Sequence, residues 1–332
     1  MKKITTICVC LVFALGCKDS GKKSVYLPGS IGPINSLLIV MENEMWKGTV
    51  GDKVREHFAA SVYGLPWDEP IFTINQIPAS VYSGTIKNSR SALIVRKDTV
   101  NAASVTPNLY ARPQRVAMVQ GGTEEEIIAL IEAKAAEMIA SFKNLELKEA
   151  QARFKRSLNK EKALEDKFGI SLAMPSVYKV GREEANFVWI DREIPKGTMN
   201  IIAYTVPGAY FKTDSTFVRD IVQMRDSIGQ KYVPGPNKDT YMITEKAFAP
   251  HVYPTEVSSI KAAEVRGIWE IHGYPMAGPF LMYIINDPEN NRKMVVEGFT
   301  FAPATAKRDY MFELEAILKT LKFTTVKEAE GK

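Results

Sequence analysis

The stretch GGTEEEIIALIEAKAAEMIASFKNL, residues 121–145, is the strongest structural signal in the chain. Thr123, followed three residues later by Glu126, is a capping-box pattern, and the intervening glutamates complement the positive end of a helix dipole. Apolar residues then recur at helical spacing along one face: Ile127, Ile131, Ala135, Met138, Phe142 and Leu145. The pattern predicts a long, charged helix over residues 123–168. It also predicts a kink or break near Asn144, where the apolar register slips.

On the N-terminal side of this helix, residues 31–122 are typical of an α/β half. Short apolar runs, rich in β-branched residues, predict strands over 36–41, 71–74, 92–95 and 116–119. Val50, Val54 and Phe58 recur at helical spacing, so the segment 50–60 is predicted to be a helix.

On the C-terminal side, residues 169–325 are typical of an antiparallel α+β half. Strands are predicted over 187–190, 199–204, 240–244, 265–271, 280–285 and 294–301, and helices over 217–228 and 314–321. The short connections between strands favour an antiparallel meander. The predicted class is therefore α+β, with an N-terminal α/β half and a C-terminal antiparallel sheet with helices, joined by a long charged helix. Whether the halves are independent domains stays open.

The first twenty residues have the pattern of an export signal. Two lysines precede an apolar run from Ile4 to Leu15, which ends at Gly16-Cys17. A basic head, a short apolar core and a small residue before the cut are typical of a secretory signal, and the cysteine after the small residue indicates lipid attachment. We expect a signal peptide at 1–16, a lipidated cysteine and flexible tether at 17–30, and a polar tail at 326–332. An ordinary signal with a coincidental cysteine is the alternative.

Lipidation would decide both the location and the cysteine chemistry of the mature chain. Diacylglycerol and a further acyl chain such as palmitate at Cys17 would hold it firmly to a membrane. Cys8 and Cys10 leave with the signal, so no thiol remains for a disulfide or a nucleophile. The expected location is the cell outer membrane, on its periplasmic face or at the cell surface.

Several segments together resemble one lipoprotein family. The lipidation signal, the run Pro33-Ile34-Asn35-Ser36, the charged central helix, and the segments 267–270, 278–280 and 297–299 are similar to an uncharacterised lipoprotein family of Bacteroidetes, a domain of unknown function. The resemblance covers essentially the whole mature chain. It implies lipidation at Cys17 and adds no catalytic residue.

Composition and motifs exclude several function classes. The net charge of +5 over 332 residues is small and evenly spread, which argues against a nucleic-acid partner. His57, His251 and His272 have no second histidine at metal-ligand spacing, so we predict no metal site and no cofactor. No nucleophile elbow or phosphate-binding loop is present.

The segment 269–280 is the best candidate for a ligand surface. It gathers Trp269, His272, Tyr274, Met276 and Phe280 around glycines that let another backbone approach. The competing interpretation, which we favour, is that Trp269 and Ile271 pack the core while the Gly-Pro segment connects two strands.

The sequence leads to a modest functional hypothesis. We predict a lipid-anchored cell-envelope protein, most simply a non-catalytic binding or assembly component with an envelope protein or glycan partner. One alternative is an envelope hydrolase acting on glycan or peptidoglycan through Asp68 or Glu69. Another is a carbohydrate-binding protein, with stacking faces from Trp46, Trp67, Trp189 and Trp269.

Overall fold

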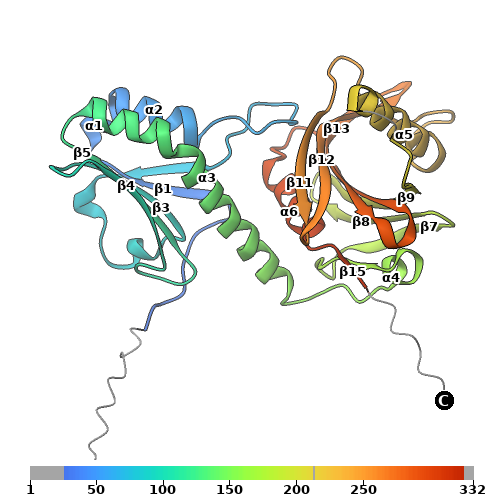
Figure 1. The fold of residues 1–332 in the computed structure, drawn as a ribbon, viewed down its shortest axis with the longest axis horizontal. Coiled ribbons are helices and arrows are strands. Elements are labelled where there is room, and N and C mark those ends of the chain that lie inside the picture. Colours follow the sequence, from blue (N-terminus) through green and yellow to red (C-terminus); the bar gives the residue numbers. More distant parts are fainter. Residues whose placement is uncertain (1–25, 212–213, 325–332) are drawn as a thin grey trace, which may run out of the picture.

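The computed structural model describes residues 26–211 and 214–324, which form two halves linked by a long helix, α3 (Figure 1). The predicted signal peptide, Cys17 and the polar tail lie outside the described residues. Of the predicted tether, the last residues are bonded to the N-terminal half, because Arg112 N–H donates to Pro28 O (2.8 Å) and its carbonyl accepts from Ser30 N–H (3.2 Å). The tether therefore does not extend to residue 30.

The N-terminal half is a five-stranded mixed sheet with helices on one face (Figure 1). The strand order is β2-β1-β3-β5-β4, parallel except for β4, which pairs antiparallel with β5. Its elements are β1 (Ser36–Val40), α1 (Asn43–Lys47), α2 (Thr49–Phe58), β2 (Thr73–Ile77), the 3₁₀ turns η1 (Ala79–Val81) and η2 (Gly84–Asn88), β3 (Ser91–Lys97), β4 (Ala102–Pro107) and β5 (Arg115–Gly121). Apolar residues of β1, β3 and β5 pack against α2 and α3 to form one core.

Helix α3 (Glu124–Phe154) begins as predicted and ends earlier. The Thr123–Glu126 capping box is present, and all six residues of the predicted apolar stripe are buried. The helix continues through Asn144 without a break, and the next buried position, Glu146, makes an ion pair with Arg90, the residue before β3. It ends at Phe154 rather than at residue 168, because the chain turns at Ser157 and pairs there with the segment around Pro175.

The C-terminal half is an eight-stranded antiparallel sheet, in the order β10-β12-β13-β14-β9-β8-β7, with β11 also paired to β12. Its strands are β7 (Lys179–Glu184), β8 (Phe187–Ile194), β9 (Gly197–Pro207), β10 (Tyr241–Thr244), β11 (His251–Val257), β12 (Ile260–His272), β13 (Tyr274–Asp287) and β14 (Arg292–Phe301). A separate pair joins β6 (Ile170–Ser171) to β15 (Lys322–Phe323). The 3₁₀ turns η3 (Asp214–Thr216) and η4 (Pro288–Asn290) lie between elements.

Helices pack on both faces of this large sheet. Helix α5 (Phe217–Tyr232) covers one face, and α6 (Arg308–Leu318) and α4 (Ala163–Phe168) lie in the core of the other. Helix α6 also contacts α3, so it lies where the two halves meet (Figure 1). The structure confirms the α+β class and its division into an α/β half and an antiparallel half.

Each half holds a buried arginine–glutamate pair that ties a helix to its sheet. Glu146 of α3 accepts from Arg90 Nε at 2.9 Å, beside β3, and from the Ser91 hydroxyl at 3.0 Å. Arg225 of α5 donates to Glu297 of β14 at 2.7 Å. Buried ion pairs of this kind hold the helix in one position on its sheet, because separating the two side chains would leave a buried charge without a counter-ion.

The sequence analysis did not predict the strands β4, β7 and β11. Each of these strands pairs with a neighbouring strand on one side only. Edge strands carry polar residues, alanine and proline, which weakens the sequence pattern of a strand. Among the described residues no helix is both long and apolar enough to cross a membrane.

A candidate binding site between the two halves

The fold separates the five residues of the predicted ligand surface. Trp269 and Phe280 are each 1% exposed and pack in the core beneath α5. Met276 is half-buried beside them, whereas His272 and Tyr274 are exposed at the β12–β13 turn. The physical reason is the two-residue alternation of a strand, which sends Trp269 and Ile271 to the inner face. The core-packing interpretation accounts for Trp269 and Phe280.

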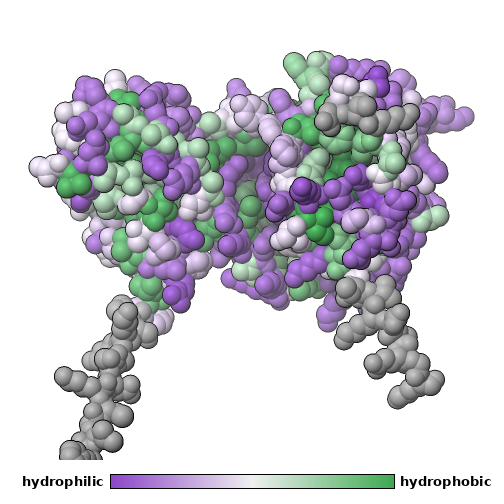
Figure 2. All heavy atoms as spheres, viewed as in Figure 1, coloured by the Kyte–Doolittle hydropathy of each residue, from purple (hydrophilic) through white to green (hydrophobic). Residues whose placement is uncertain are grey.

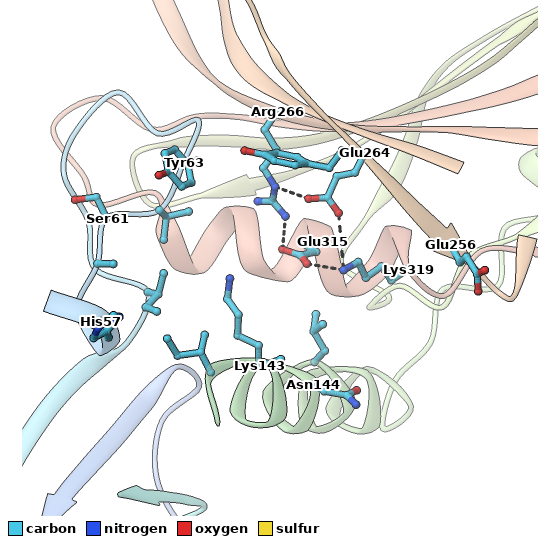
Figure 3. A pocket seen from close by; sticks show the side chains of 17 residues that line it. His57, Ser61, Tyr63, Lys143, Asn144, Glu256, Glu264, Arg266, Glu315 and Lys319 are labelled. Atoms are coloured by element: carbon cyan, nitrogen blue, oxygen red, sulfur yellow. Dashed lines mark hydrogen bonds and ion pairs between the residues drawn. The ribbon is translucent and has the colours of Figure 1, made fainter. Parts of the chain in front are cut away.

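A cleft of about 720 Å³ lies instead between the two halves (Figure 3). Its walls come from the end of α2, the loop after it, the middle of α3, strands β11 and β12, and α6. In the space-filling view the surface is recessed between the two lobes, and both hydrophilic and hydrophobic residues lie in the recess (Figure 2). A concave site of this volume between two lobes is a common location for ligands.

The C-terminal wall of the cleft is a closed ion-pair network. Arg266 of β12 donates to Glu264 at 2.6 Å and to Glu315 of α6 at 2.8 Å. Lys319, just after α6, pairs with Glu315 at 2.9 Å (Figure 3). The Tyr283 hydroxyl donates to Glu264 at 2.9 Å. Every carboxylate in this network is therefore engaged.

The pKa values in the network follow from these contacts. Burial alone would raise the pKa of Glu315, but Arg266 and Lys319 outweigh burial and hold that pKa at about 2. Burial raises the pKa of Tyr283 well above its ordinary value, and the neighbouring glutamates act in the same direction. Glu315 is thus a permanent carboxylate at neutral pH, which disqualifies it as a general acid.

Lys143 of α3 faces this network from the opposite wall and has no partner (Figure 3). Its ammonium has no ion pair or hydrogen bond among the described residues. Burial lowers the pKa of Lys143, and the repulsion from Arg266 and Lys319 adds to that effect, while Glu315 opposes it. Arg266 and Lys319 pair with Glu264 and Glu315, so Lys143 and the exposed Glu256 are the two charged side chains of the cleft lining without an ion pair among the described residues.

Two further features complete the cleft. His57, at the end of α2, lines it with a buried Nε2 that has no hydrogen-bond partner. At the mouth, the rings of Tyr63, His251 and Tyr253 follow one another at centroid distances of 5.6 and 6.3 Å. Gly64 lets the loop approach β12 closely, because its φ is +79° and a Cβ there would lie 3.1 Å from Arg266 Cβ.

Glu69, proposed from sequence as a hydrolase carboxylate, has a structural role. It is 8% exposed, and its carboxylate accepts from the backbone N–H groups of Lys307 (2.7 Å) and Arg308 (2.8 Å) at the start of α6. It is a helix cap supplied by the other half, so it is not free for acid–base chemistry. Its exposed neighbour Asp68 has no hydrogen bond among the described residues. Nor do any three His, Cys, Asp or Glu side chains gather as a metal site in the part of the chain that the structure describes.

The four tryptophans proposed for carbohydrate stacking lie in two different kinds of surroundings. Arg55 lies over Trp46 at 4.4 Å and Lys307 over Trp67 at 4.0 Å, so each of these rings already carries a cation on one face. Trp189 and Trp269 instead line one small cavity in the C-terminal half.

Sequence reasoning missed the residues of the cleft. Lys143 lies between Phe142 and Leu145 of the apolar stripe of α3, and Glu264 and Arg266 alternate along a strand. These are weak signals, because charged residues at such positions are usually solvated. Only the packing of α3 against α6 brings them together.

The comparisons with known proteins divide the chain at the end of α3. Residues 30–155 match Domain of unknown function (DUF8532), and residues 157–320 match Domain of unknown function (DUF4837). A comparison with curated proteins finds no match. The chain is thus similar to two domains for which no function is described, and their boundary coincides with the turn that ends α3.

Proposed function

We propose that this chain is a lipid-anchored protein of the cell envelope that acts by binding, with the cleft between its halves as the binding site. The attachment through Cys17, and the location at the outer membrane on its periplasmic face or at the cell surface, rest on the first twenty residues. The binding role rests on the geometry of the cleft.

One observation carries the proposal: the partnerless ammonium of Lys143 in a partly apolar cleft. Lys143 is half-buried, and a cation that is partly removed from water without a counter-ion costs stability, a cost commonly retained at sites that need the charge. Ile71, Ile139 and Leu147 line the same space. The matching ligand is an organic anion whose carboxylate or phosphate pairs with Lys143 and whose apolar or ring-shaped body contacts these side chains.

The same geometry favours binding over hydrolysis. A hydrolase of the glycosidase type needs one protonated and one ionised carboxyl group on either side of the substrate. Glu264 and Glu315 are both held by Arg266, and Glu315 has a pKa of about 2. Glu315 is therefore not suited to donate a proton at neutral pH.

The test compares two probes with the same apolar body and opposite charge. Calorimetric titration of the mature chain with 4-phenylbutyrate should show binding, and 4-phenylbutylamine should bind much more weakly. Lys143→Met keeps the side-chain length and removes the charge, so it should weaken 4-phenylbutyrate binding by about tenfold or more. Lys148→Met, an exposed position on the same helix and outside the cleft lining, is the matched control. Equal binding of both probes, or an unchanged affinity in Lys143→Met, would refute the assignment.

The ring row at the mouth supports a second candidate, a carbohydrate that carries an acid group. Tyr63 is 70% exposed, and sugars stack on aromatic faces of this kind. Methyl β-D-glucuronide should then bind more tightly than methyl β-D-glucoside, and Tyr63→Ala should weaken it. Binding of 4-phenylbutyrate with no response to either glycoside would leave the simple organic anion as the ligand class.

The anchor has its own test. Cells fed labelled palmitate should incorporate the label into the wild-type chain and not into Cys17→Ala. Failure of the wild type to take up label would remove the lipid anchor from the proposal and leave the cleft unaffected.

A further inference from the structure

A second cavity, of about 270 Å³, lies in the C-terminal half on the sheet face that α5 covers. Strands β8, β9, β12, β13 and β14 each contribute to its lining. The loop after α5, Pro234-Gly235-Pro236, also lines it. Gly235 is packed tightly there, since its N–H donates to Thr240 O at 2.8 Å and a Cβ would lie 2.6 Å from Ile271.

The lining is aromatic and uncharged. Trp189, Trp269, Phe299 and Phe301 supply four aromatic rings, Met276 is among the apolar residues, and no charged side chain takes part. A cavity of this kind selects a neutral ligand, because a charge inside it would lose its hydration without gaining a partner.

One polar atom of this cavity's lining residues has no partner. Trp189 Nε1 donates to Asn200 Oδ1 at 3.1 Å, and Asn200 Nδ2 donates to Thr198 Oγ1 at 3.1 Å, so those groups satisfy one another. Trp269 is 1% exposed, and its Nε1–H has no acceptor. A buried indole N–H normally finds a hydrogen-bond partner, and leaving one unpaired is unfavourable.

We infer that this cavity is a binding site for a small, neutral, ring-shaped molecule that carries a hydrogen-bond acceptor, and that the acceptor pairs with Trp269 Nε1–H. The rings of Trp189 and Phe299 pack against each other, with centroids 6.1 Å apart and planes tilted by 55°, and together form one aromatic wall of the cavity. Gly278 gives the indole its room, since a Cβ there would lie 3.0 Å from Trp269 Nε1. The site is separate from the cleft and stands whether or not the cleft binds an anion.

The test uses two probes of nearly equal shape. Acetophenone carries a carbonyl oxygen, and α-methylstyrene has a methylene group in its place. Both are titrated into the mature chain labelled with [¹⁵N]tryptophan, and the indole N–H signals are followed by NMR. Phenylalanine variants at the four positions Trp46, Trp67, Trp189 and Trp269 assign the signals one by one, so the assignment of Trp269 survives even if its own variant folds poorly.

Acetophenone should shift the indole signal of Trp269 downfield, and α-methylstyrene should bind about tenfold more weakly because it cannot accept the hydrogen bond. Trp269→Phe keeps an aromatic ring without the donor, so it should reduce the preference for acetophenone to near unity. Equal affinities of the two probes for the wild type would overturn the role of Trp269. The absence of any shift at saturating acetophenone would overturn the site and leave a cavity filled by water.

Discussion

At the scale of single residues, the surroundings decide what each charged group of the cleft can do. The side chains of Glu315 and Lys143 are both partly shielded from water, yet only Glu315 makes ion pairs. Its ionised form is stabilised, whereas the ionised form of Lys143 is penalised. One group is therefore a structural anchor, and the other remains available to a ligand.

Glu315→Gln should destabilise the fold in a manner that depends on pH. The folded-state pKa is about 2, below the ordinary 4.5, so the ionised side chain stabilises the fold above pH 4.5, and this contribution is lost as the pH falls toward 2. We expect the free energy of unfolding in urea to drop by about 3 kcal/mol at pH 7 and by clearly less at pH 3.5. Glu137→Gln, in an exposed pair with Lys134, should change it by less than about 1 kcal/mol at either pH. A gap that stays constant between the two pH values would contradict this account of Glu315.

The sequence was informative about some residues and silent about others for a physical reason. The buried stripe from Ile127 to Leu145 was predictable because its period belongs to one helix. Lys143, Arg266 and Glu315 lie on three elements distant in sequence, and no local pattern specifies that they line one cleft. Glu69 looked like a free carboxylate beside Asp68, and only the fold reveals the helix end that it caps.

At the scale of elements, two helices at the junction begin in different ways. Helix α3 is capped by its own Thr123 and Glu126, which a local pattern predicts. Helix α6 has no side-chain cap from its own N-cap residue and receives the carboxylate of Glu69 from the other half. The capping box of α3 stabilises that helix alone, whereas the cap on α6 joins the N-terminal half to the C-terminal half.

Glu69→Ala should therefore cost more than a local cap. Removing the carboxylate leaves the buried N–H of Lys307 and that of Arg308 without an acceptor, so the free energy of unfolding should fall by about 2–3 kcal/mol. Thr123→Ala should cost about 1 kcal/mol, and Asp68→Ala, at the exposed neighbouring position, less than about 0.5 kcal/mol. Denaturant unfolding of the three variants measures this order. A loss for Glu69→Ala no greater than for Asp68→Ala would show that the cap does not join the halves.

At the scale of the whole molecule, the cleft exists because two sheets of different type are held at a fixed separation by α3 and α6. The α/β half and the antiparallel half each have their own core, and their contact is limited to the junction. The fold class and most of the long elements were predictable, because each half follows its own periodicity. The cleft was not, since it belongs to neither half alone.

The partnerless cation at this junction leads to the last prediction, that Lys143→Met stabilises the fold. Because burial lowers the folded-state pKa of Lys143 below its ordinary 10.5, the charged lysine opposes folding at neutral pH. Its removal should raise the free energy of unfolding by about 1 kcal/mol at pH 7. This increase in the free energy of unfolding should become smaller as the pH rises toward 10.5. The wild-type lysine is then deprotonated in the folded state, so its charge no longer destabilises the fold. Urea unfolding of wild type, Lys143→Met and the exposed control Lys148→Met at pH 7 and pH 10 measures both effects. A destabilised Lys143→Met at pH 7 would mean that the ammonium serves the fold itself, and the case for a ligand at this position would fail with it.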